Sequence, residues 1–233
     1  MLESDVICKV ACGGVEPKFV SWGTTVKIIK SGNIKNYALL NEVLCYELGL
    51  LFGVKVCKAE RIDKNRIYSE FAYGLNTYFV TAKQLFGSET FDKYFTIAEL
   101  YRRYGDGCVK DFQRMLLFDL ITRQEDRHIS NFAFCSDGLY PLYDNGRCLF
   151  WNSVDISNVL CDVVNTFVKN EHGYGYAYID MLGEEYCDSL LNKVGYNNIF
   201  ELFCKYYDGE RARILSQYVY KVYKLVTGGV IDA

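Results

Sequence analysis

The sequence has little proline, little histidine and no excess of positive charge. Only 2 prolines occur in 233 residues, whereas 20 tyrosines, 15 phenylalanines and a 50% apolar fraction can fill a sizeable core. This composition is typical of a globular protein and excludes a disordered or fibrous chain. The formal net charge of −3 argues against nucleic acid as a partner, because phosphate binding needs clustered basic surface.

Long apolar runs and metal-binding cysteine pairs are also missing. No run approaches the ~20 residues of a membrane-spanning helix, and the start, MLESDVICKV, has acids where a signal peptide has a basic segment. We therefore expect a cytoplasmic protein that does not engage a membrane. The 10 cysteines form no CxxC pair and only 2 histidines accompany them, which argues against a zinc site. We expect the cysteines to be reduced and mostly buried.

The first part of the chain has the pattern of a small sheet with one helix. Residues 5–30 combine β-branched side chains with glycines, which indicates short strands. Residues 38–52 carry leucine and valine at helical spacing, and Gly53 is well placed to end that helix. Residues 59–62 and 66–71 are expected to pair as a hairpin.

The remainder is mainly helical in pattern. Helices are expected at 94–104, 111–124, 179–193 and 197–226. The sequence therefore predicts an α+β fold with two lobes. A small β-rich N-lobe with one main helix would span residues 1–72, and a mostly helical C-lobe would span 73–233.

The sequence contains two polar motifs, and a hairpin expected between them would bring them together. The stretch EDRHISNFAF begins at Glu125, and YDNG follows it after a short interval. Strand-like runs after Asn131 and before Asp144 flank the turn signal Ser-Asp-Gly at 136–138. The open ends of this hairpin would place Asn131 beside Asp144. Asp126 lies one short loop earlier.

This set of side chains suits phosphoryl transfer with a bound divalent ion. Mg²⁺ prefers oxygen ligands and completes its shell with water and nucleotide phosphates. Asn131 and Asp144 are therefore the candidate ligands for Mg²⁺ (or Mn²⁺). Asp126 is the candidate base, which orients or deprotonates an acceptor hydroxyl. The alternative is a surface loop in which Asp and Asn serve as caps.

The motif D-R-H-x-x-N followed by P-L-Y-D-x-G resembles the HipA-like kinases, which are relatives of the protein-kinase fold. Shorter matches occur in the family's order: GGVEPKFV at 13–20 resembles the phosphate-covering loop, Val26-Lys27 the lysine strand, NEVLCYELGLLFGV at 41–54 the helix with the lysine-pairing glutamate, and IYSEFAY at 67–73 the strand entering the hinge. The chain begins near the phosphate loop and so resembles the short stand-alone members. A toxin role or an antitoxin partner does not follow from this resemblance.

The resemblance implies a two-lobed protein-kinase-like fold and a kinase that uses ATP and Mg²⁺ to phosphorylate a Ser or Thr hydroxyl of a protein. It implies phosphate contacts from Gly13, Gly14 and Lys18, and adenine binding near Glu70, Phe71 and Ala72. Lys27 would contact the α- and β-phosphates and pair with Glu42.

Several of these assignments have rivals within the sequence. Lys30 and Glu47 compete with Lys27 and Glu42. Glu42 alternatively interacts with the helix dipole, Gly13-Gly14 forms an ordinary turn, and Lys18 is a solvated strand lysine.

The polar residues around the motif are open to more than one interpretation. His128 is interpreted as structural, bracing the loop by hydrogen bonds. Arg127 either pairs with a carboxylate or contacts phosphate, and Asp119 either bonds to the loop or is solvated.

Two other functions compete with a protein kinase. Phosphatidylinositol kinases share D-R-H-x-x-N but continue with Asp-Phe-Gly where this chain has Asp-Asn-Gly, so a lipid or small-molecule kinase is one alternative. A nucleotide-binding pseudokinase that serves as an interaction module is the other.

Overall fold

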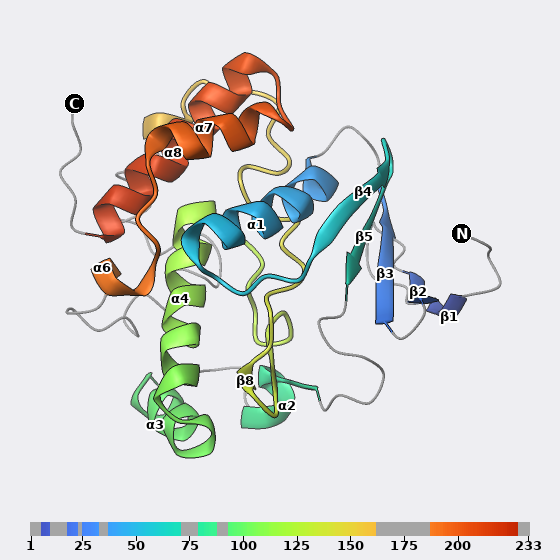
Figure 1. Ribbon diagram of the computed structural model, residues 1–233, viewed down its shortest axis with the longest axis vertical. Helices are drawn as coiled ribbons and strands as arrows, with labels where there is room; N and C mark the ends of the chain where they lie inside the picture. The colour runs from blue at the N-terminus through green and yellow to red at the C-terminus, as the bar shows by residue number, and fades with distance from the viewer. Residues whose placement is uncertain are drawn as a thin grey trace.

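The structure, a computed structural model, describes residues 6–9, 18–22, 25–32, 37–70, 79–87, 93–161 and 187–227. A five-stranded sheet with one long helix against it is followed by a mostly helical part (Figure 1). Among the helices within these ranges, none combines the length and the hydrophobicity that a membrane span requires.

The sheet has the strand order β1-β2-β3-β5-β4, and each neighbouring pair is antiparallel. Its strands are β1 (Val6–Lys9), β2 (Lys18–Trp22), β3 (Thr25–Ser31), β4 (Ala59–Asp63) and β5 (Arg66–Glu70). The expected hairpin of β4 and β5 is confirmed.

Helix α1 (Ala38–Phe52) has the bounds expected from its leucine and valine spacing. It ends at Gly53, whose φ of 75° is left-handed and whose N–H donates to the carbonyl of Gly49, because glycine adopts this conformation without a steric penalty. One side of α1 packs on the sheet through Leu39 and Val43. The other side joins the core of the helical part, so α1 lies between the two parts of the molecule.

The register of β3 and β5 decides which residues face α1. Ile67 of β5 packs with α1, and Lys30 of β3 lies directly opposite Ile67. Side chains opposite each other in an antiparallel pair share one face of the sheet. Lys27, three residues earlier and opposite Glu70, therefore lies on the other face.

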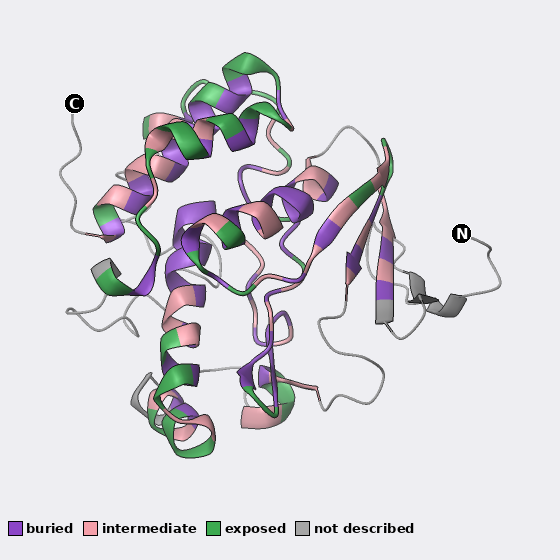
Figure 2. Cartoon of the chain, in the orientation of Figure 1, coloured by how far each residue is buried: buried purple, intermediate pink, exposed green. Residues whose placement is uncertain are grey.

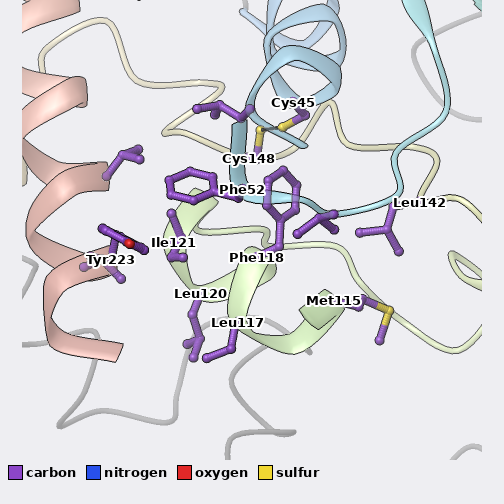
Figure 3. Close-up of a cluster of buried hydrophobic side chains, with 14 of the residues drawn as sticks. Cys45, Phe52, Met115, Leu117, Phe118, Leu120, Ile121, Leu142, Cys148 and Tyr223 are labelled. Atoms are coloured by element: carbon purple, nitrogen blue, oxygen red, sulfur yellow. Dashed lines mark hydrogen bonds between the residues drawn. The ribbon is translucent and has the colours of Figure 1, made fainter. Parts of the chain in front are cut away.

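The helical part contains α2 (Ala82–Phe86), α3 (Lys93–Tyr104), α4 (Asp106–Thr122), a 3₁₀ helix η2 (Val159–Cys161), α6 (Cys187–Leu190), α7 (Tyr196–Cys204) and α8 (Gly209–Val226). α4 is almost fully buried toward its C-terminal end (Figure 2). Figure 3 shows Phe118 of α4 in one cluster with Phe52 of α1 and Tyr223 of α8, and the rings of Phe52 and Tyr223 lie 5.2 Å apart. This core fixes the end of α4 that leads into the polar motif.

The expected single helix over 197–226 is wrong. α7 and α8 are separate helices, and the carboxylate of Asp208 caps α8 by accepting a hydrogen bond from the N–H of Arg211 at 2.9 Å. Asp is a favoured N-cap residue, and this local signal interrupts the apolar periodicity. Of the helix expected at 179–193, the described residues hold only α6, and residues 179–186 lie outside them.

The expected hairpin after Asn131 is confirmed. β7 (Ala133–Cys135) and β8 (Gly138–Leu139) pair antiparallel, and β6 (Val80–Thr81) adds a third strand beside β7. The N–H of Tyr140 donates to the carbonyl of Ala133 at 2.9 Å and extends the pairing. The hairpin thus returns the chain toward the loop from which it started.

Candidate active site

The loop after α4 folds tightly around its own backbone. Arg123, left-handed with φ of 48°, ends the helix. The N–H of His128 donates to the carbonyl of Asp126 at 2.9 Å, and the N–H of Asn131 donates to the carbonyl of His128 at 2.7 Å. The side-chain Nδ2 of Asn131 donates to the carbonyl of Asp126 at 2.8 Å. This bond orients the amide of Asn131 so that its oxygen is the atom that can serve a cation.

Arg127 is the fully buried anchor of the site. Its guanidinium forms an ion pair with Asp119 of α4 at 3.0 Å, with both side chains 0% exposed. One guanidinium nitrogen, Nη1, donates at 2.8 Å to the carbonyls of both Asn131 and Tyr143, and Nη2 donates to the side-chain oxygen of Asn145. Because a single nitrogen binds the carbonyls of residues on both sides of the hairpin, the two ends of the hairpin lie close together. Of the two interpretations of Arg127, the pairing with a carboxylate is the observed one, and Asp119 bonds to the loop and is not solvated.

Asp144 sits in a left-handed turn with φ of 55°. Its carbonyl accepts from Nε2 of Gln124 at 3.3 Å, and its carboxylate lies 2.9 Å from Nζ of Lys30 on β3. Partial burial opposes the charged form, but the Lys30 ammonium prevails and lowers the pKa of Asp144. The carboxylate is therefore ionised at neutral pH, as a metal ligand must be.

Lys30 also forms an ion pair with Glu42 of α1. Burial alone would lower the pKa of Lys30, but the two carboxylates of Glu42 and Asp144 raise it above the ordinary value, so the amine stays protonated. Glu42, Lys30 and Asp144 thus form a continuous chain of charges from α1 through the sheet to the hairpin.

The expected pairing of Lys27 with Glu42 is corrected by these contacts. Lys27 pairs instead with Glu70 at 3.1 Å, and its Nζ lies 3.8 Å from the centre of the Tyr68 ring. Strand alternation is the cause, because Lys27 points to the face of the sheet away from α1. Glu42 lies beyond the first turn of α1 and is 4% exposed, so its partner is Lys30 and not the helix dipole.

Other expected residues are placed as follows. Glu47 faces the helical part, where it pairs with Lys205 at 3.1 Å and accepts from Tyr206. His128 accepts a hydrogen bond at Nδ1 from the N–H of Ser130 at 3.2 Å, which agrees with a bracing role. Lys18 belongs to β2, and Glu70 is the last residue of β5. Gly13, Gly14, Phe71 and Ala72 lie outside the described residues.

Arg147 is a neighbour of the candidate base that sequence reasoning missed. Its guanidinium lies 3.4 Å from the carboxylate of Asp126, and the two side chains are 53% and 24% exposed. The carbonyl of Arg147 accepts from the N–H of Glu125 at 3.1 Å, which holds the two loops side by side. A basic residue one position after the Asp-Asn-Gly turn was the available signal.

The donor set at the hairpin base fits a hard divalent cation. Within the described residues, no three His, Cys, Asp or Glu side chains gather where they could hold a metal ion. The candidate ligands remain those expected from the sequence, the amide oxygen of Asn131 and the carboxylate of Asp144. Such a pair suits Mg²⁺, which takes its remaining ligands from water and phosphate.

Comparison with known proteins identifies the family. The family model of the HipA-like C-terminal domain matches residues 10–148, more than half of the chain. This chain belongs to the HipA-like family. The match covers β2 to β5, α1 and the polar motif, and the predicted family resemblance is confirmed.

Solved structures share the fold of this HipA-like chain. The Helicobacter pylori proinflammatory kinase CtkA aligns with a TM-score of 0.73 and 10% identity, covering 95% of this chain and 94% of that one. HipA of Shewanella oneidensis MR-1, from a complex with HipB and operator DNA, aligns with a TM-score of 0.53 and 12% identity, covering 98% and 67%. No curated protein sequence matches. The predicted kinase-like α+β fold is confirmed, and family and fold together support a phosphotransferase.

The buried Asp119–Arg127 pair predicts a large loss of stability on mutation. Asp119→Ala leaves the Arg127 guanidinium buried without its carboxylate, and we expect the free energy of unfolding to fall by about 3–5 kcal/mol. Urea unfolding followed by circular dichroism measures this change. Asp106→Ala is the matched control on the same helix. It removes an exposed pair with Lys110 and should cost about 1 kcal/mol or less. Equal losses in the two variants would show that Arg127 is not the anchor of the site.

Proposed function

We propose that this HipA-like chain is a protein kinase that transfers the γ-phosphate of ATP to a Ser or Thr hydroxyl. The observation that carries the proposal is the charge chain from Glu42 through Lys30 to Asp144, which ends beside the Asp126–Asn131 loop because Arg127 binds the carbonyls of both Asn131 and Tyr143. Phosphoryl transfer depends mainly on positioning and charge neutralisation, and this arrangement supplies both.

Each described side chain has a role in the proposal. Lys30 holds the α- and β-phosphates, and Glu42 keeps its ammonium in place. Asn131 and Asp144 hold Mg²⁺ (or Mn²⁺), which when bound neutralises phosphate charge. Asp126 accepts the proton of the acceptor hydroxyl as that oxygen bonds to the γ-phosphorus, while the bond from this phosphorus to the β,γ-bridging oxygen breaks and ADP leaves.

The remaining assignments are proposed from the family pattern alone. Gly13, Gly14 and Lys18 cover the phosphates, and the backbone of 70–72 holds the adenine. We place the lobe boundary between residues 72 and 73 and the reaction in the cytoplasm. HipB and operator DNA are partners of the Shewanella protein, and the proposal for this chain extends only to ATP and a protein acceptor.

The direct test is incubation of the purified chain with γ-labelled ATP, Mg²⁺ and a protein mixture, followed by phosphoamino-acid analysis. Labelled phosphoserine or phosphothreonine that disappears with Asp126→Asn supports the proposal. Label in extracted lipid or in a small molecule would instead support the alternative kinase. Nucleotide binding without transfer to any acceptor would indicate a pseudokinase.

Nucleotide binding predicts a metal-dependent gain in stability. A ligand that binds only the folded state at a hundredfold excess over its Kd adds ~2.7 kcal/mol, which raises Tm by roughly 5–10 °C for a chain of this size. We expect this shift with millimolar ATP and Mg²⁺ and its loss when EDTA is added. Differential scanning fluorimetry measures it, with AMP as the control nucleotide. An equal shift with ATP in EDTA would argue against the Asn131–Asp144 metal site.

A further inference from the structure

The C-terminal helices α7 and α8 and the loop between them contact α1, the helix that carries Glu42. The loop between α7 and α8 contributes Tyr207, whose hydroxyl donates to the side-chain oxygen of Asn41 on α1. At the start of α1, the Arg211 guanidinium lies 3.6 Å from the centre of the Tyr37 ring. Figure 1 shows α7 and α8 lying along the side of α1 away from the sheet. These contacts come from a region of the chain without any recognisable sequence motif.

Asn41 connects the C-terminal region to the loop that follows Asp144. Its side chain is 0% exposed, and Nδ2 donates to the carbonyl of Cys148 at 2.5 Å and to that of Gly146 at 3.4 Å. Gly146 and Cys148 are two and four residues beyond Asp144. One amide therefore uses its oxygen for the C-terminal region and its nitrogen for the loop that follows the metal-site carboxylate.

Asn41 and Glu42 are consecutive on α1, so their side chains project about 100° apart around the helix axis. Asn41 points to the loop and to Tyr207, whereas Glu42 points to Lys30 on the sheet. A shift or rotation of α1 that frees Glu42 from Lys30 would also break the bonds of Asn41. Losing them inside the core is costly, because buried polar groups without partners are strongly unfavourable.

Arg211 holds the next part of the same loop. Its guanidinium donates to the carbonyl of Ser153 at 2.8 Å and to that of Phe150 at 3.3 Å. Leu149 and Phe150 are left-handed, with φ of 50° and 56°, a conformation that persists only when surrounding contacts impose it. The C-terminal helices thus hold both α1 and the segment after Asp144.

From these contacts we propose that Asn41 and Tyr207 are positioning residues that keep Glu42 against Lys30. The C-terminal helices thereby hold the phosphate-binding lysine in its working position. The expected effect on phosphate transfer rests on the proposed function. The statement that Asn41 and Tyr207 hold α1 in place rests only on the contacts of α1.

The test removes one hydrogen-bonding group at a time. Tyr207→Phe keeps the ring and deletes the donor to Asn41, and we expect kcat to fall about fivefold to tenfold with a smaller change in KM for the protein acceptor. Asn41→Asp keeps the oxygen that Tyr207 uses and removes the NH₂ that holds the loop, so a larger loss of up to about 10²-fold is expected. Tyr223→Phe is the matched control. Its hydroxyl is also buried on the C-terminal helices but bonds to Asn192 and Val194, and its kcat should stay within about twofold of wild type.

A double-mutant cycle with Glu42→Gln separates positioning from general stability. If Tyr207 acts through Glu42, Tyr207→Phe should change kcat less than about twofold in the Glu42→Gln background. The same fivefold to tenfold loss in both backgrounds would overturn the inference, as would wild-type kcat in the Tyr207→Phe single variant.

Hydrogen exchange gives an answer that does not depend on activity. The amides of residues 41–46 should exchange faster in Tyr207→Phe than in wild type and should be unchanged in Tyr223→Phe. Unchanged exchange in both variants overturns the inference. A wild-type chain that transfers no phosphate overturns the proposed function instead, and the exchange data alone then decide whether Tyr207 holds α1.

Discussion

Lys30→Ala is expected to lower kcat/KM for phosphate transfer by about 10²–10³-fold, the usual effect of removing one preorganised charge contact to the reacting group. The ammonium of Lys30 lies between Glu42 and Asp144, and both carboxylates favour its protonated form. In the proposed function, a fixed positive charge at this point would contact the phosphates beside the proposed metal site. Single-turnover transfer with labelled ATP measures the loss, and ATP titration calorimetry measures how much of it is lost binding.

Lys27→Ala is the matched control for Lys30→Ala. Both lysines belong to β3, and Lys27 is also buried, at 6% exposure, but it points to the opposite face and pairs with Glu70. We expect Lys27→Ala to reduce transfer less than about tenfold, mostly through lost stability. If Lys27→Ala abolished transfer while Lys30→Ala spared it, the nucleotide would have to bind the face of the sheet away from α1.

Replacing each of the two carboxylates of the site should affect a different step. Asp126→Asn is expected to slow transfer by about 10²–10⁴-fold while Mg²⁺–ATP binding stays nearly intact, because a positioned base acts on the acceptor hydroxyl and not on the nucleotide. Asp144→Asn replaces an anionic ligand by a neutral one next to a divalent ion, so metal-dependent ATP binding itself should weaken. Calorimetric titration of each variant with ATP, with Mg²⁺ and with EDTA, separates the two effects.

The contacts of the two residues support this division. Asp126 shares a hydrogen bond with Asn131 through its backbone carbonyl, and its carboxylate lies near the half-exposed Arg147 at the surface of the site. Asp144 instead contacts Lys30, at the end of the charge chain. The opposite result, with binding lost in Asp126→Asn and retained in Asp144→Asn, would reverse the roles assigned to them.

Local features of the sequence were sufficient for the elements that carry the site. The bounds of α1 followed from its apolar spacing and from Gly53, because helix periodicity and a glycine stop are properties of adjacent residues. The hairpin between Asn131 and Asp144 followed from two apolar runs and the turn signal at 136–138. The approach of the two ends of the hairpin was therefore predictable without any long-range contact.

Tertiary structure decided which of two lysines pairs with Glu42. The sequence pattern favoured Lys27, which follows Val26, over Lys30, but the packing of Ile67 on α1 defines the face of β3 that meets Glu42, and Lys30 lies on that face. The burial of Arg127 against Asp119 likewise depends on α4 lying beneath the loop.

The contacts of the C-terminal region with α1 also could not be predicted from the sequence. Tyr207 lies 166 residues from Asn41, and no local pattern in the chain links the two positions. A periodic or turn signal reports on neighbours within a few residues, whereas strand faces, buried ion pairs and helix docking depend on residues that become neighbours only when the chain has folded. The residue types and spacing of this sequence thus determined the candidate chemistry, and the tertiary structure decided which lysine pairs with Glu42 and Asp144.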